Sequence, residues 1–160
     1  MLSKRDYVRY FEQIACLERQ KVYRLFDLLQ DLDDAYIVKL MRGMLADAQN
    51  LYGRILNVLQ LESLTEGGAD KRLVNRRSAL GKVRLLVSER GAIQEISACC
   101  VNYTHQGLCF ESTNRVVVGA PYEVLISLYD QKETIRCSGK VAWVKETFPG
   151  FFTAGMQFDT

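Results

Sequence analysis

The stretch Thr65-Glu66-Gly67-Gly68-Ala69-Asp70 divides the sequence into two halves with different hydrophobic patterns. Before it, residues 3–62 contain no proline, and their apolar residues recur every three or four positions, which is typical of amphipathic helices. After it, β-branched and aromatic residues come in short runs separated by turn residues, which is typical of strands. The paired glycines between the halves predict a flexible linker. The sequence therefore predicts an α+β protein whose helices precede its strands.

The helical half predicts an antiparallel hairpin over residues 1–64. A first helix begins after Ser3, which forms a capping pattern with Asp6, and runs to about Gln30. The turn Asp31-Leu32-Asp33-Asp34 then supplies a new N-cap, and its carboxylates favour the positive end of the next helix.

The second predicted helix carries two adjacent rows of apolar side chains. The first row has the spacing of a coiled-coil seam and contains Ile37, Met41, Met44, Ala48, Leu51, Ile55 and Val58. The second row contains Val38, Leu45, Tyr52 and Leu59. One partner helix covers the seam but not both rows, so we expect a homodimer through residues 3–62, with the second row inside a bundle of two hairpins. The alternative is that the second row packs against the chain's own C-terminal half, which predicts a monomer.

The C-terminal half predicts six short strands with turn signals between them. The expected strands are Lys82–Ser88, Ala92–Val101, Gly107–Glu111, Tyr122–Tyr129, Thr134–Val144 and Phe151–Phe158. This number and spacing favours a small six-stranded antiparallel β-barrel over residues 78–160, joined to the hairpin by a linker over residues 65–77.

Composition and motifs exclude several classes of protein. With 48% hydrophobic residues and a net charge of +2, the chain is expected to fold, and it has no uncharged run long enough for membrane insertion. No signal sequence is recognisable, and the five cysteines are odd in number without a CxxC pair, which favours free thiols in the cytoplasm. The only histidine, His105, is interpreted as an exposed turn residue. Because there is one histidine and no pairing of Cys and His residues at ligand spacing, neither a metal nor another cofactor is expected. No catalytic motif occurs, and we expect no enzyme activity.

Basic residues cluster between the linker and the first strands. They are Lys71, Arg72, Arg76, Arg77, Lys82, Arg84 and Arg90, and Glu89 is the one acid among them. A solvated basic linker accounts for this charge by itself. A mobile arginine-rich segment beside a barrel is also suited to close over an anionic ligand.

Two motifs and the pattern of the last strands favour the second interpretation, in which the basic segment binds a ligand. Arg72-Leu-Val-Asn-Arg76 is an RxxxR motif, and Asn102-Tyr103-Thr104-His105-Gln106-Gly107 matches [DN]-x-[ST]-x-x-G between the second and third strands. The chain ends with a strand that contains Trp143, a turn, and Ala154-Gly155-Met156-Gln157-Phe158. This order and spacing resembles the PilZ family of bacterial cyclic di-GMP receptors over about residues 70–160.

The resemblance implies a PilZ-like barrel and a set of ligand-binding residues. Arg72 and Arg76 correspond to the two motif arginines, and a guanidinium can bind phosphate, stack on a purine or pair with the O6 and N7 atoms of guanine. Asn102 corresponds to the Asp/Asn that reaches a guanine edge. Thr104, in place of the usual serine, and Gly107 hold the turn and admit the ligand. The further candidates are Lys71, Arg77 and Trp143, although core or barrel-rim packing also accounts for Trp143.

The function implied is that of a cyclic di-GMP receptor that relays binding to an unknown protein partner in the control of bacterial motility, biofilm or surface behaviour. The alternative is a PilZ-fold scaffold with little or no nucleotide binding, which acts through protein contacts. General binding of DNA is disfavoured, because the net charge is only +2 and no basic stripe follows the predicted helices.

Overall fold

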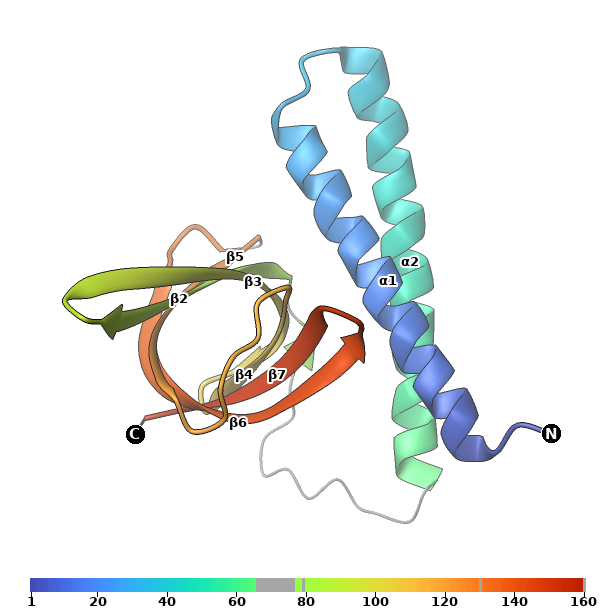
Figure 1. Ribbon diagram of the computed structural model, residues 1–160. Coiled ribbons are helices and arrows are strands. Elements are labelled where there is room, and N and C mark those ends of the chain that lie inside the picture. Colours follow the sequence, from blue (N-terminus) through green and yellow to red (C-terminus); the bar gives the residue numbers. More distant parts are fainter. Residues whose placement is uncertain (66–76, 79, 130, 160) are drawn as a thin grey trace. The chain divides into compact units, whose positions relative to one another are not determined.

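The structure is a computed structural model that describes residues 1–65, 77–78, 80–129 and 131–159. The chain divides into two compact units, Met1–Arg72 and Leu73–Thr160. The first contains the helices and the second the strands, so the α+β architecture expected from the sequence is confirmed (Figure 1). Within the described residues, no helix combines the length and the apolar character needed to cross a membrane.

The first unit is an antiparallel hairpin of α1 (Lys4–Gln30) and α2 (Ala35–Thr65) (Figure 1). Its first helix begins with a capping box, in which the Asp6 amide donates to Ser3 Oγ and the Ser3 amide donates to Asp6 Oδ2. Hydrogen bonds that the Asp6 carboxyl accepts from the Ser3 hydroxyl and the Ser3 amide lower its pKa. Asp34 caps α2 by accepting from the amides of Tyr36 and Ile37. Both helix starts were predicted from the sequence and are confirmed.

The face of α2 that packs within the hairpin includes only part of the predicted seam, of which Ala48 and Ile55 are buried. Leu45 and Tyr52, expected to lie in a contact with another chain or with the barrel, are buried, and the Tyr52 hydroxyl accepts a 2.8 Å hydrogen bond from Arg19 Nη1 of α1. Four other residues of the seam are exposed, namely Ile37, Met44, Leu51 and Val58. The physical reason is Arg19, which is only 6% exposed and requires a polar partner that Tyr52 provides.

The second unit contains seven strands. They are β1 (Arg77–Ser78), β2 (Gly81–Glu89), β3 (Ala92–Thr104), β4 (Gly107–Ser112), β5 (Pro121–Leu128), β6 (Ile135–Phe148) and β7 (Phe151–Phe158). Six of them form a closed antiparallel barrel in the order β3-β2-β5-β6-β7-β4, with β4 paired back onto β3. The predicted six-stranded barrel is therefore confirmed. The two-residue β1, which the sequence assigned to the linker and the barrel start, pairs with β3.

The barrel interior is filled by apolar side chains from every one of its six strands. The most deeply buried are Val83, Leu85, Cys100, Leu108, Phe110, Val124, Ile126, Val141, Ala154 and Met156. Because residues alternate between the two faces of a strand, this core also identifies the residues on the outer face of the barrel.

Candidate functional site

The pairing of β1 with β3 positions the end of the basic segment. Arg77 lies opposite Tyr103, and Ser78 lies opposite Asn102. Arg76, the second motif arginine, directly precedes Arg77 in the sequence. Lys71, Arg72 and Arg76 themselves lie outside the described residues.

A β-bulge in β3 decides which way Asn102 faces. Cys100 pairs with Phe110 but Asn102 pairs with Cys109, so Val101 is an extra residue in the ladder. Simple alternation from the buried Cys100 would direct Asn102 into the barrel. With the extra residue, Tyr103 packs against the core, where burial raises the pKa of its hydroxyl. Asn102 and Thr104 therefore lie on the outer face.

The second motif lies on a strand end and a tight turn. The sequence placed Asn102 and Thr104 between two strands, and this was wrong: β3 continues to Thr104, which pairs with Gly107. Thr104 Oγ1 accepts a 3.1 Å hydrogen bond from the Gln106 amide, which is the local bond by which hydroxyl residues stabilise turns. His105 is exposed in this turn, as predicted.

Gly107 is required where two strands approach each other closely. A Cβ atom at this position would lie 2.4 Å from the backbone carbonyl oxygen of Met156 on β7. The motif glycine therefore permits the contact between β4 and β7 that closes the barrel beside the turn.

Cross-strand pairing gathers the candidate residues on one outer surface, because directly paired residues face the same side of a sheet. One row runs across four strands and contains Asn102, Cys109, Gly155 and Trp143. The next row contains Thr104, Gly107, Gln157 and Lys140. We call these eight residues the barrel face. Cys109, Gly155, Gln157 and Lys140 were not predicted as site residues, since only the strand register places them beside the motif.

Trp143 lies on the barrel face and not in the core. A bulge between Val141 and Trp143 reverses the alternation of β6, so Val141 and Val144 contact the core and Trp143 faces outward. A Cβ atom at Gly155 would lie 2.1 Å from the Trp143 indole Nε1, which shows that the indole crosses Gly155. The side chain remains 40% exposed. It therefore offers an aromatic surface about three strand spacings, or about 14 Å, from Asn102.

Asn102 carries a buried polar atom without a partner. Its Oδ1 is inaccessible to solvent, and none of the described residues forms a hydrogen bond with it. Buried polar atoms in proteins are rarely left unpaired, because the desolvation cost is about 1–3 kcal/mol. The atom is an acceptor that a donor outside the described residues can satisfy.

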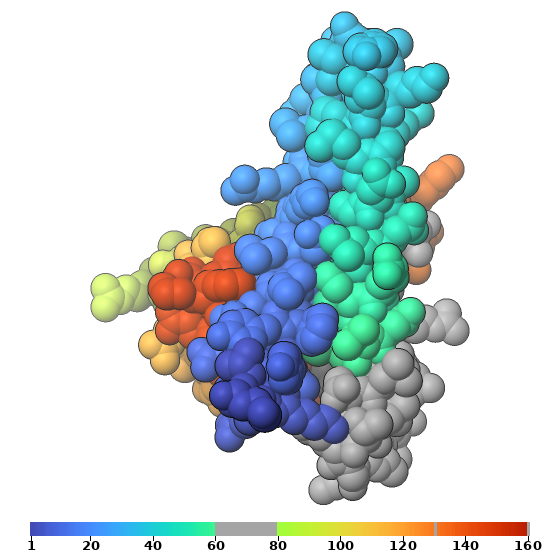
Figure 2. All heavy atoms as spheres, turned by 90° about the vertical axis from the view of Figure 1, so that its right-hand side faces the viewer, coloured from blue at the N-terminus to red at the C-terminus, as the bar shows by residue number. Residues whose placement is uncertain are grey.

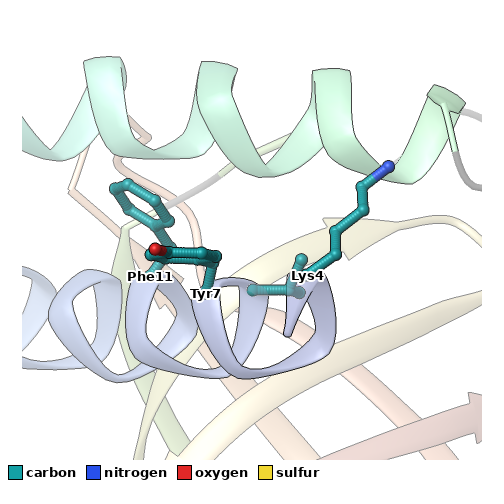
Figure 3. Close-up of a pocket in the computed structure, with 4 residues that line it drawn as sticks. Lys4, Tyr7 and Phe11 are labelled. Carbon is teal, nitrogen blue, oxygen red and sulfur yellow. The ribbon is translucent and has the colours of Figure 1, made fainter. Parts of the chain in front are cut away.

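Two hollows lie in different units. One, of about 450 Å³, is lined by Lys140, Val141, Ala142, Gln157, Phe158 and Asp159 and so adjoins the Thr104 row. The other, of about 350 Å³, lies at the start of α1 and is lined by Lys4, Tyr7, Val8 and Phe11 (Figure 3). Only the first shares residues with the barrel face, so we take it as part of the candidate site.

No family model matches the sequence, and no curated protein matches it. Among the described residues, no group of three or more His, Cys, Asp or Glu side chains is arranged to hold a metal ion.

Proposed function

We propose that the protein is a cyclic di-GMP receptor, a binding protein rather than an enzyme, and that it binds the ligand between the barrel face and the arginine segment of residues 71–77. The observation that carries the proposal is the unpartnered, buried Oδ1 of Asn102 on the outer face. Asn102 is paired with β1, which directly follows the RxxxR motif.

The chemistry of the barrel face suits a guanine base. Asn102 Oδ1 needs a donor, and guanine carries an amino group at N2 on the same molecule as the O6 and N7 acceptors. Gly107 and Gly155 add no side chain to the middle of the surface, and Trp143 at its far side offers a ring for stacking. Arg72 and Arg76 supply charge for two phosphates, and their planar guanidinium groups can also bind a guanine edge.

We further propose that the signal passes to a protein partner through the helical hairpin, in the control of bacterial motility, biofilm or surface behaviour. The competing proposal is a scaffold of the same fold that has no useful nucleotide affinity. The retained arginines and the unpartnered Asn102 oxygen favour the receptor.

Calorimetric titration with cyclic di-GMP tests the receptor proposal, with GMP and cyclic AMP as control ligands. We expect saturable binding of cyclic di-GMP alone. Either Arg72→Ala or Arg76→Ala should cost about 1.5–3 kcal/mol of binding free energy, which is roughly a ten- to hundredfold loss of affinity. The matched control is Arg115→Ala, which removes an exposed arginine in the loop after β4, at the end of that strand away from Gly107.

The outcomes separate the two proposals. Binding that is lost in the arginine variants but retained in Arg115→Ala supports the receptor. Absence of binding by the wild-type protein, or equal affinity in the Arg72/Arg76 double variant, would favour the scaffold. Circular dichroism melts of all variants establish that any loss is not caused by unfolding.

A further inference from the structure

The helical hairpin has one face whose large apolar side chains are exposed. Ten large apolar residues on it are between 36% and 58% exposed. They are Tyr7, Tyr10, Ile14, Leu17 and Leu28 on α1, and Ile37, Leu40, Met44, Leu51 and Val58 on α2. We call these ten residues the hairpin face. Tyr7 is also visible in Figure 3, beside Phe11 on the first turns of α1.

Spacing places each set on one side of its helix. The α1 residues follow steps of three and four, and the two positions that would fill the gap before Leu28 are Lys21 and Arg24. The α2 residues follow the same steps, and the two positions that interrupt them are Asp47 and Arg54. Each helix thus carries a second heptad-like stripe besides the one inside the hairpin.

The two stripes lie on the same face of the hairpin. On α1, Ile14 directly precedes the buried Ala15; on α2, Leu51 directly precedes the buried Tyr52. Successive residues are about 100° apart around the helix axis. On each helix, the exposed stripe therefore lies about 100° around the axis from the side that contacts the other helix, in the direction of lower residue numbers. Because the helices are antiparallel and face each other, these equal turns carry both stripes to one side. The two helices run side by side along the hairpin, α1 in blue and α2 in cyan to green (Figure 2).

The charges on α2 make this face complementary to itself. Asp47 lies four residues before Leu51 and Arg54 three residues after it, which is about 6.0 Å and 4.5 Å along the helix. A twofold axis through Leu51, perpendicular to the helix, reverses the direction of the second copy. Asp47 of each copy then lies within about 1.5 Å of the height of Arg54 in the other, and both side chains are exposed.

The same axis also matches apolar residues with apolar residues. Leu51 meets its own copy, and Met44 and Val58 lie seven residues on either side of it, so each meets the other across the axis. Two hairpins joined in this way form a four-helix bundle, which is a common way to cover a two-helix apolar face.

We propose that the protein forms a homodimer through the hairpin face, with α2 packed antiparallel against α2 of a second copy around Leu51. Asp47 of each subunit pairs with Arg54 of the other. This proposal does not depend on nucleotide binding. It also differs from the interface expected from the sequence, since Leu45 and Tyr52 lie inside one hairpin.

Light scattering on the full chain, with charge variants, tests the proposal. The wild-type protein is expected at about twice the 18.3 kDa of one chain at micromolar concentration. Asp47→Arg and Arg54→Asp each place like charges together and should each weaken the dimer at least tenfold. The double variant D47R/R54D restores both pairs and should recover the dimer. The matched control is Arg42→Asp, the same change at an exposed position of α2 off the hairpin face.

Three results would overturn the proposal. They are a monomeric wild-type protein, a dimer that is unaffected by either single charge change, and a double variant that stays dissociated when the single variants dissociate. The charge changes are at exposed positions, so the hairpin is expected to stay folded. A helical circular dichroism signal equal to that of the wild type checks this for each variant.

Discussion

Asn102 is the residue at which ligand binding and folding can be separated. Its Oδ1 forms no hydrogen bond with the described residues, so Asn102→Ala breaks none of the bonds known to hold the fold. We predict that the affinity for cyclic di-GMP falls by roughly two- to tenfold, the loss expected for one neutral hydrogen bond of about 0.5–1.5 kcal/mol, while the melting temperature is unchanged. Gln94→Ala is the control, an exposed change on the same strand far from the turn. Equal affinities for wild type and Asn102→Ala would contradict the assignment.

The two glycines of the barrel face should respond differently to alanine. In Gly107→Ala the new Cβ meets a backbone oxygen of Met156, which cannot move without disturbing β7, so we predict a loss of about 1–3 kcal/mol in unfolding free energy. In Gly155→Ala the three atoms nearest to the new Cβ all belong to the indole of Trp143, a side chain that can rotate away. We predict a smaller loss of stability there and a changed fluorescence of this single tryptophan. Equal losses of stability for the two variants in thermal melts would contradict this prediction, because they would show that the indole cannot rotate away.

At the scale of elements, the hydrogen bond between Arg19 and Tyr52 determines which face of α2 packs against α1. Tyr52→Phe removes the acceptor of the 2.8 Å bond but keeps the ring, whose centroid lies 5.3 Å from the Arg19 guanidinium carbon. We predict a loss of about 1–3 kcal/mol in the stability of the helical unit, measured by circular dichroism, without a change in oligomeric mass. Tyr36→Phe, at a side chain that is 71% exposed, is the control and should melt like the wild type. If Tyr52→Phe also melts like the wild type, the bond does not stabilise the hairpin.

The same element shows what a hydrophobic pattern can and cannot predict. Both helices and their caps follow from local signals, the capping box at Ser3 and the carboxylate at Asp34. Local signals do not predict whether the row of Leu51 or the row of Tyr52 packs within the hairpin, because both rows are apolar at heptad spacing. The packed row depends on Arg19 of α1, which contacts Tyr52. The hydrophobic pattern of α2 alone cannot predict this contact.

The strands repeat this division between local and long-range information. Turn residues and alternation predicted all six barrel strands to within a few positions. The bulges at Val101 and between Val141 and Trp143 were not predictable, because an extra residue in one ladder has no fixed sequence signature. These two bulges direct Asn102 and Trp143 outward, so the sequence could name both candidates but could not bring them onto one surface.

At the scale of the whole molecule, the two units are proposed to have different tasks. The barrel face with the arginine segment is proposed to bind the nucleotide, and the hairpin face is proposed to hold two copies together. A ligand that binds as proposed therefore contacts the barrel face and the arginine segment directly, but not the hairpin face. The residues that the ligand perturbs can be identified independently of the affinity with which it binds.

Amide chemical-shift mapping, during titration of the isotopically labelled full chain with cyclic di-GMP, tests most directly whether the barrel face binds this ligand. We predict saturable shifts for the amides of residues 102–109 and 155–157 and for the indole N–H of Trp143, with Gln94 in the same barrel unperturbed. Saturable shifts confined to the hairpin, or no shifts at all, would contradict the claim that the barrel face binds this ligand.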